Sequence, residues 1–367
     1  MILKSIFWFF ATVLFLGVLV LCFVKFHPVF GGVPDEISMA KIRASKAYNG
    51  KTFENAQPTV LATSDEMPSM LSWLYDMIFT PKGKNPSRAL PSVKFEPSAL
   101  KNGDFVWFGH SSVLFRINDL NIITDPVFYR ASPIFVGGAP FAYEITPRIS
   151  DLPDKLCVVI SHDHYDHLDM RAIREIDAKA ERYIVPLGVR AHLLRWGVSD
   201  EKITELDLEE SARVNGVSFT LERARHFSGR FHRNTTLWGS YAIITDGARI
   251  FYGGDSGDGE HFAQIAQKYG HFDIAMLENG AYNRAWAQIH SMPEQSAKNA
   301  SVLGARVLLP IHWAKFDLAY HKWSEPMERL VRASKEAGAK YTIATPLVGE
   351  VFNLSNLPQN KWWESVK

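Results

Sequence analysis

The stretch "CVVISHDHYDHLD", residues 157–169, places a dense group of ligand-type side chains directly after an apolar run. The run itself has the composition of a buried β-strand. The eight residues after Ser161 contain three histidines and three aspartates. Packing so many imidazoles and carboxylates together without a cation would oppose like charges and lone pairs in a confined space. The pattern therefore predicts a metal-binding loop at the end of a strand.

Other ligand-type residues follow other predicted strands. His226 follows "VSFTLERAR", Asp255 follows "RIFYGG" and His312 follows "RVLLPI". If these strands lie side by side, their ends share one edge of the sheet, where rigid strands fix the ligands and loops leave a position open for water. The seven candidate metal ligands are His162, His164, Asp166, His167, His226, Asp255 and His312.

The ligand types restrict the metal. Histidine nitrogens and carboxylate oxygens without thiolates suit zinc, with manganese or iron as alternatives, whereas calcium and magnesium prefer mostly oxygens. Seven ligands exceed what one tetrahedral zinc uses. We therefore expect two metal ions, roughly 3.5–4 Å apart, that activate water for hydrolysis without a covalent nucleophile from the protein.

The surrounding pattern predicts an α/β fold. Residues 104–117 and 120–127 have the pattern of paired strands, and further strands are predicted up to residue 312. Helical patterns lie between the strands, at 169–180, 258–269 and 293–303. We expect a sheet-based domain whose helices cover the outer faces.

The N-terminus predicts a membrane anchor. "SIFWFFATVLFLGVLVLCFV", residues 5–24, carries no charge and is flanked by Lys4 and Lys25, as one helical crossing of a bilayer requires. A cleaved signal peptide is the alternative, although the run is long for one. We expect a single-pass protein of a bacterial inner membrane. The flanking charges leave open which side the soluble part occupies.

Three segments are predicted along the chain: an anchor at 1–25, a tether and N-terminal wrap at 26–97, and a metallo-hydrolase domain at 98–355. Within the wrap, "MPSMLSWLYDMIF", residues 67–79, has one charge among large apolar groups. It is expected either to lie on a membrane surface or to pack on the domain.

Composition excludes some classes of protein. A net charge of +1 without a basic stripe argues against nucleic-acid binding. Cys22 and Cys157 are the two cysteines, and the first lies in the apolar segment, so a disulfide framework is not expected. Cys157 is expected to act as a small apolar residue in its strand.

"SHDHYDHLD" matches the His-x-His-x-Asp-His signature of the metallo-β-lactamase superfamily. Together with "WFGHSS", "TDPVFYRASP", "RHFSGR", "GGDSG", "IHSMPEQ" and "LPIHWAKFDLA", it resembles the branch that contains N-acylphosphatidylethanolamine-hydrolysing phospholipase D and related bacterial membrane-associated proteins. The resemblance covers about residues 67–330. It implies an αβ/βα four-layer sandwich, here preceded by one transmembrane helix, with a binuclear zinc centre at the sheet edge.

The resemblance also assigns roles to individual residues. It implies one metal held by His162, His164 and His226, a second held by Asp166, His167 and His312, and Asp255 as the bridge. Asp166, Asp255 and His290 are the expected catalytic residues. The family has a histidine near the site at the position of His290, and we expect it to donate a hydrogen bond or a proton to the leaving oxygen, with packing at a helix start as the alternative.

Three further residues lie close to the predicted ligands. Tyr165 is expected either to touch substrate or to pack. His110 and Asp125 are expected to orient the ligand imidazoles through their other ring nitrogen.

The resemblance and the anchor together favour a phospholipase D-type phosphodiesterase that acts on a membrane phospholipid such as N-acylphosphatidylethanolamine. The expected partners are that phospholipid and the bilayer, and a homodimer is left open. A lactonase or other carbonyl hydrolase that acts on a soluble substrate, with or without a phosphate group, shares the same set of ligands and remains the alternative. A membrane protein that keeps its metals only for structure is the third.

Overall fold

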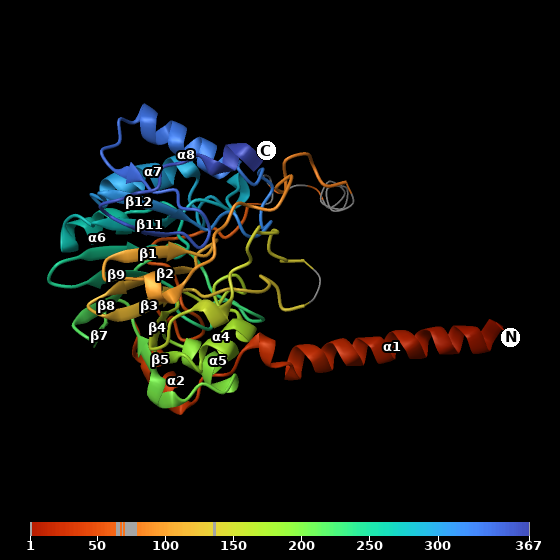
Figure 1. Ribbon diagram of the computed structural model, residues 1–367. Coiled ribbons are helices and arrows are strands. Elements are labelled where there is room, and N and C mark those ends of the chain that lie inside the picture. Colours follow the sequence, from red (N-terminus) through yellow and green to blue (C-terminus); the bar gives the residue numbers. More distant parts are fainter. Residues whose placement is uncertain (1, 64–66, 68, 70–78, 135–136, 367) are drawn as a thin grey trace.

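Two seven-stranded β-sheets pack face to face, and helices cover the outer face of each (Figure 1). The computed structural model describes residues 2–63, 67, 69, 79–134 and 137–366. Helices α4 and α5 cover one sheet, while α6, α7 and α8 cover the other. This is the four-layer αβ/βα sandwich that the sequence predicts, so the expected fold class is confirmed.

The first sheet has the order β14-β1-β2-β3-β4-β5-β6. Its strands, in this order, are Val351–Asn353, Asp104–Trp107, Val113–Ile117, Leu120–Thr124, Leu156–Val159, Ala180–Pro186 and Ile203–Leu206. The second sheet has the order β13-β12-β11-β10-β9-β8-β7. Its strands, in this order, are Thr342–Ile343, Val307–Ile311, Ile274–Glu278, Arg249–Tyr252, Ser240–Ile244, Val217–Glu222 and Ser211–Val214.

The helices are mostly short. They are α1 (Ile2–Phe26), α2 (Glu36–Ala44), α4 (Met170–Ile176), α5 (Val189–Arg195), α6 (His261–Tyr269), α7 (Pro293–Val302) and α8 (Glu325–Glu336). The predicted helices at 169–180, 258–269 and 293–303 correspond to α4, α6 and α7. Helices α2, α5 and α8 and strands β6, β7, β11, β13 and β14 were not predicted.

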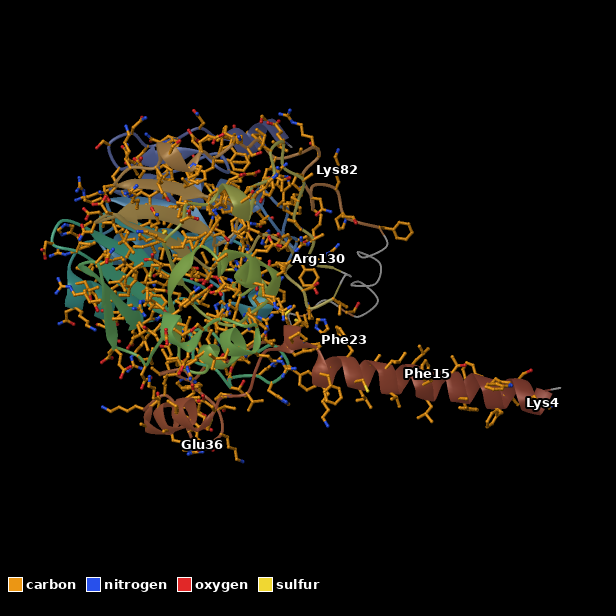
Figure 2. The ribbon with its side chains drawn as sticks, turned by 60° about the horizontal axis from the view of Figure 1, so that its bottom comes forward. Lys4, Phe15, Phe23, Glu36, Lys82 and Arg130 are labelled. Carbon is orange, nitrogen blue, oxygen red and sulfur yellow. The ribbon has the colours of Figure 1, made fainter. Side chains whose placement is uncertain are left out.

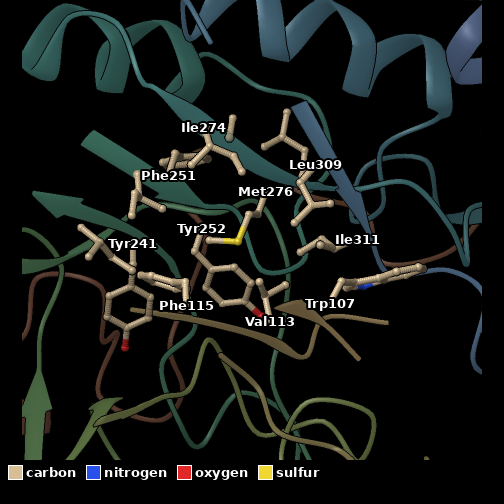
Figure 3. Close-up of a cluster of buried hydrophobic side chains, with 14 of the residues drawn as sticks. Trp107, Val113, Phe115, Tyr241, Phe251, Tyr252, Ile274, Met276, Leu309 and Ile311 are labelled. Carbon is tan, nitrogen blue, oxygen red and sulfur yellow. The ribbon is translucent and has the colours of Figure 1, made fainter. Parts of the chain in front are cut away.

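The main hydrophobic core lies between the sheets (Figure 3). Trp107 and Phe115 come from the first sheet and face Phe251, Met276 and Leu309 of the second. All five are buried. Large apolar side chains from both sheets fill this space because each sheet turns one whole face away from water.

A second core lies between the first sheet and its helices. Ile173 of α4 and Leu193 of α5 pack there against Val158 of β4. All four residues of β4 are buried, as expected for a strand covered on both faces. Cys157 is one of them and is fully buried, and burial raises the pKa of its thiol to about 12.

Helix α1 projects away from the domain (Figure 1). Its segment Lys4–Phe26 is long and apolar enough to cross a membrane, and no part of that segment is buried in the protein. A signal sequence near an N-terminus satisfies the same two criteria. The predicted membrane segment 5–24 therefore coincides with one continuous exposed helix.

The segment after α1 runs along the domain. Ile42, Phe53 and Leu90 of this segment are buried in the main core. At the other end of the chain, Trp362 stacks on Trp313 with ring centroids 5.2 Å apart. The predicted membrane-surface segment 67–79 lies outside the described residues except for Met67, Ser69 and Phe79.

Replacing Leu309 by alanine tests the core between the sheets. Leu309 is 1% exposed, so Leu309→Ala should lower the free energy of unfolding by about 2–5 kcal/mol through lost burial and a residual cavity. Denaturant titration of the full chain measures this change. Val302→Ala, at an exposed position of α7, is the control, and an equal loss in both variants would contradict the assigned core.

Candidate metal centre

The ends of several strands meet at one edge of the second sheet. Strands β10, β11 and β12 are parallel, so their carboxyl ends share this edge. Strand β8 pairs antiparallel with β9, and β9 pairs antiparallel with β10, so β8 also ends there. This topology places His226, Asp255, Glu278 and His312 together. The sequence predicted this grouping for His226, Asp255 and His312, which each follow a predicted strand.

The loop after β4 crosses from the first sheet to this edge. The backbone N–H of Gly239 donates to the Ser161 carbonyl at 3.1 Å, and the Tyr241 hydroxyl donates to the Ile160 carbonyl at 2.9 Å. Gly254, with φ +55°, lies so close that a Cβ there would be 2.7 Å from the Ser161 Cβ. The close approach of the two sheets therefore requires glycine before Asp255.

One group of ligand atoms consists of three imidazole nitrogens. Nε2 of His162 lies 2.9 Å from Nδ1 of His164. The same Nδ1 atom lies 3.2 Å from Nε2 of His226. Four ligands at ordinary zinc distances in a tetrahedron stand about 3.3 Å apart. The spacing of these three nitrogens fits a single ion.

A second group forms around Asp166. Its Oδ2 atom lies 3.4 Å from Nε2 of His312 and 3.6 Å from Nε2 of His167. Both distances again fit the edges of one coordination sphere. The structure thus brings together the two sets of three residues that the sequence resemblance implies.

Asp255 lies between the two groups. Its Oδ2 atom is 2.9 Å from Nε2 of His312 and 3.1 Å from Nε2 of His167. It is 3.8 Å from Nε2 of His226 and 4.0 Å from Nε2 of His162. Only a residue placed between both sets can approach all four nitrogens, which is the position of a bridging ligand.

The other ring nitrogen of each buried histidine is occupied. Nδ1 of His226 donates to the Ile289 carbonyl at 2.8 Å, and Nδ1 of His312 lies 3.3 Å from the Gly280 carbonyl. Nδ1 of His167 lies 2.6 Å from the Asp125 carboxylate. These contacts place the proton on Nδ1 and leave the Nε2 lone pairs for a cation.

Buried atoms without partners give a direct test of whether these residues suit an ion. Among the described residues, Nε2 of His167, Nε2 of His312 and Oδ1 of Asp255 are buried and have no hydrogen-bond partner. Buried polar atoms are costly when unpaired. The three atoms belong to one cluster, in which Nε2 of His167 and Nε2 of His312 lie 3.1 and 2.9 Å from the other Asp255 carboxylate oxygen. The residues present therefore fit divalent metal ions.

The pKa values of His162 and Asp255 favour the protonation states that bind a metal ion. Burial, helped by neighbouring imidazoles, holds the pKa of His162 well below its ordinary value, which favours the neutral form that binds metal. Burial opposes the charge of Asp255, but the imidazoles of His167 and His312 outweigh it and hold the pKa of that carboxyl well below its usual range. The carboxylate therefore stays ionised in the centre.

Two further residues contact the ligands, and Asp125 does so at a ring nitrogen, as expected, whereas His110 contacts a carboxylate. Nε2 of His110 lies 3.1 Å from Oδ2 of Asp166. Asp125 contacts His167, accepts hydrogen bonds from both the backbone and the hydroxyl of Ser161, and contacts the Tyr252 hydroxyl. His110 and Asp125 have positive φ angles of 53° and 32°. Such backbone strain persists where surrounding contacts over-determine it, as at functional sites.

Glu278 is a residue of the site that the sequence reasoning missed. It is the last residue of β11, and its Oε2 atom accepts a hydrogen bond from Nδ1 of His290 at 2.8 Å. Its Oε1 atom accepts hydrogen bonds from the backbone N–H groups of Ser256 and Ser291. Its place at a strand end, like that of the metal ligands, was the signal that could have revealed it. Glu278 fixes the ring of His290 and leaves Nε2 of that histidine free to act.

The predicted substrate contact of Tyr165 remains a prediction. The Tyr165 hydroxyl donates to the Arg230 carbonyl at 3.1 Å, and the guanidinium of Arg230 lies 4.1 Å from the centre of the Tyr165 ring. Tyr165 does not line the cleft that contains the metal ligands. It lines a neighbouring cleft at the base of α1.

The catalytic cleft lies directly over the metal ligands and has a volume of about 320 Å³. His164, Asp166, Asp255, His290 and His312 form its floor. Apolar side chains form its walls: Leu61, Phe227, Trp286, Ile289 and Leu318.

Replacing Asp255 by asparagine tests the bridging position. Purified full-length protein should contain about two equivalents of metal, and Asp255→Asn should lose most of both because one carboxylate serves two ions. Elemental analysis by mass spectrometry measures the content. Asp246→Asn, at an exposed loop position, should keep both equivalents. One tightly held ion that survives Asp255→Asn would refute a shared ligand.

Comparisons with known proteins agree with this geometry. The family model described as "Beta-lactamase superfamily domain" matches residues 120–313. An uncharacterized protein of Mycobacterium tuberculosis is 38% identical over 341 residues, which cover 88% of this chain and 90% of the relative. The N-acyl-phosphatidylethanolamine-hydrolyzing phospholipase D 1 of Caenorhabditis elegans is 30% identical over 268 residues, 68% of this chain and 75% of that protein.

The fold also matches solved structures. The metallo hydrolase Igni18 of Ignicoccus hospitalis superposes with a TM-score of 0.52 at 19% identity, covering 68% of this chain and 97% of that one. At this identity the likeness concerns the fold alone. The assignment to a family rests on the matched family model and on the relatives that are similar in sequence. The chain therefore belongs to the metallo-β-lactamase superfamily and is a metal-dependent hydrolase of that superfamily.

Proposed function

We propose that this chain is a phosphodiesterase that uses two divalent metal ions, zinc foremost, to cleave a bilayer phospholipid on its head-group side. N-acylphosphatidylethanolamine is the model substrate, because two similar proteins are named for its hydrolysis. The observation that carries the proposal is the chemistry of the catalytic cleft. Its floor offers metal ligands and its walls offer an apolar surface.

The walls of the cleft suit a lipid. Phe227 and Trp286 present aromatic surface beside the ligand histidines, and Leu61 and Leu318 add aliphatic surface. Apolar walls with a few convergent polar groups are typical of sites for ligands that are largely hydrophobic. The phosphodiester of a phospholipid lies between its polar head group and its apolar chains. A lipid entering this cleft can therefore place its phosphate over the metal ligands and its glycerol end against the walls.

A soluble phosphorylated substrate fits these walls less well. Among the described residues that line the catalytic cleft, none is lysine or arginine. Enzymes that hold a phosphate as a recognition handle usually use such cations. The lack of one in the described lining favours the phosphodiesterase over a sugar-phosphate lactonase.

The residues of the site divide the work of hydrolysis. Divalent metal ions held by the seven ligands would act as Lewis acids. They would also lower the pKa of a bound water molecule to near neutrality. Water contributes the new P–O bond, and the bond from phosphorus to the head-group oxygen breaks. His290, held by Glu278 through Nδ1, presents Nε2 to donate a proton to that leaving oxygen. The carboxylates of Asp166 and Asp255 contact His167 and His312 and help to hold these two ligands in place.

Helix α1 would hold this cleft beside its substrate. The helix satisfies the length and hydropathy of one membrane crossing. An anchored enzyme meets lipids of its own bilayer without a separate binding step. The anchor therefore favours a lipid substrate over one that diffuses in solution.

A comparison of three substrates tests the proposal. Metal-loaded full-length protein in detergent is given N-acylphosphatidylethanolamine, a bis(aryl) phosphodiester and a simple lactone, and the products are identified by mass spectrometry. Release of phosphatidic acid from the lipid, and cleavage of the soluble diester, are expected. Lactone hydrolysis with both diesters left intact would replace the proposal by the carbonyl-hydrolase alternative.

Replacing His290 by alanine tests the proton donor. His290→Ala should keep its metals but lower turnover of the lipid by about 10²–10⁴-fold, the usual range for a proton-transfer group. Turnover and metal content are measured on the same preparation. His271→Ala, at an exposed position, should behave like the unaltered protein. Full activity in His290→Ala would show that this residue only packs at the helix start and does not donate a proton.

Deleting most of α1 tests the anchor. The full chain should stay in the membrane fraction during alkaline carbonate washing, because twenty uncharged residues bury more hydrocarbon than a surface helix. Removal of residues 2–22 should release the chain and lower activity on lipid vesicles. Activity on the soluble phosphodiester should persist, because the metal ligands are untouched. Equal activity on vesicles with and without α1 would leave the helix without a role in catalysis.

A further inference from the structure

A second cleft lies where α1 meets the domain. It has a volume of about 720 Å³ and is larger than the catalytic cleft. Phe23 of α1 and His27, just after that helix, line it together with residues 128–130, 132–134 and 169–171 of the domain. The two clefts share no lining residue among those described. The second cleft is therefore a separate site.

The second cleft combines apolar walls with positive charge. Phe23, Phe128 and Ile134 contribute apolar surface, and three arginines, Arg130, Arg171 and Arg230, also line it. One carboxylate, Asp169, lies among them. That carboxylate already accepts hydrogen bonds from the backbone N–H groups of Tyr129, Arg171 and Ala172. Arg171 also forms an ion pair with Glu175, Nε to Oε1 at 3.2 Å, so the positive charge of the lining without a carboxylate partner in the described part of the chain comes from Arg130 and Arg230.

One guanidinium nitrogen of Arg230, Nη2, has no hydrogen-bond partner among the described residues. Its Nε atom donates to the Val29 carbonyl at 2.8 Å, and its Nη1 atom donates to the carbonyls of Asp163 and Leu168, each at 2.8 Å. The Nη2 atom itself is buried. A guanidinium with a free nitrogen in a cationic cleft is suited to a phosphate oxygen.

The position of the second cleft indicates what fills it. The candidate membrane segment ends at Phe26, so the cleft opens where the acyl chains of a bilayer give way to head groups. Figure 2 shows Phe23 and Arg130 on the side of the domain from which α1 leaves. The molecule available at this level that carries both a phosphate and an apolar chain is a phospholipid.

We infer that the second cleft binds a phospholipid of the bilayer that is not the substrate. Its phosphate pairs with Arg130, Arg171 and Arg230, and an acyl chain lies against Phe23, Phe128 and Ile134. The inference rests on α1 as the membrane anchor and is independent of the reaction proposed for the metal centre. The bound lipid would seat the domain on the membrane surface.

A photoreactive lipid tests this site. Full-length protein in detergent micelles is mixed with phosphatidylglycerol that carries a diazirine in one acyl chain, irradiated, and digested for mass spectrometry. Adducts are expected on peptides that contain residues 128–134 and 169–171. Adducts confined to residues 5–22 of α1 would show only the lipid that surrounds any membrane helix, and would overturn the inference.

Charge variants test the phosphate contact. The double variant Arg130→Gln/Arg171→Gln should reduce labelling of the second cleft about tenfold, as expected for the loss of charge-assisted hydrogen bonds. The matched control, Arg213→Gln/Arg249→Gln, alters two exposed arginines on the second sheet and should label fully. Thermal unfolding checks that both variants are folded. Equal labelling of the two variants would refute a phosphate site.

Two competitors separate a lipid site from a site for free phosphate. Dihexanoyl phosphatidylglycerol should compete with the probe, and glycerol phosphate should not. Equal competition by glycerol phosphate would overturn the assignment to lipid. Labelling does not require turnover, so His290→Ala should label like the unaltered chain. Failure of the hydrolase proposal would therefore leave this result unchanged, and failure here would leave the hydrolase proposal unchanged.

Discussion

The approach of the Nε2 atoms of four metal-ligand histidines to one carboxylate oxygen of Asp255 is the constraint on which the rest of the structure depends. The four nitrogens lie within 4.0 Å of that atom. Such a cluster is stable only with a cation among its lone pairs and with ligands that cannot move apart. Two sheets pressed face to face supply this rigidity. Gly254 lets the two sheets approach closely, and the hydrogen bonds of Asp125 hold Ser161 and His167 in place, so both features help to keep the ligands fixed.

Much of this centre could be predicted because its ligands follow strands. The apolar run before His162 and the runs before Asp255 and His312 are strong patterns that survive in the structure. Glu278 escaped because its strand, Ile274–Glu278, contains alanine, methionine, leucine and glutamate, which favour helices, so this short run does not distinguish a strand from part of a helix. The role of Arg230 escaped because its partners lie 62 to 201 positions away in the chain. Spacing within a motif cannot reveal contacts of that kind.

Asp163 shows how one motif serves two purposes. It stands between the ligands His162 and His164, yet its side chain faces away from the centre. Its Oδ1 atom accepts a hydrogen bond from the Gly229 N–H at 2.6 Å, and its Oδ2 atom lies 3.3 Å from Nε2 of His192. Nδ1 of His192 in turn accepts a hydrogen bond from the Gly32 N–H at 2.9 Å. The metal-binding loop is thereby joined to the segment that follows α1.

The segment between α1 and the domain is not a free linker. Four contacts fix its backbone within seven residues: Arg195 to Phe26, Trp196 to Pro28, Arg230 to Val29, and His192 to Gly32. A flexible linker of that length would let the domain wander over about 15 Å. Here the domain keeps one height and one tilt relative to the helix axis. With α1 across a bilayer and a lipid as substrate, as proposed above, its remaining freedom would be rotation about that axis and sideways diffusion, and its search for lipid would be two-dimensional. The rate of encounter would then follow the number of target lipids per unit area of membrane, whatever the volume of the surrounding solution.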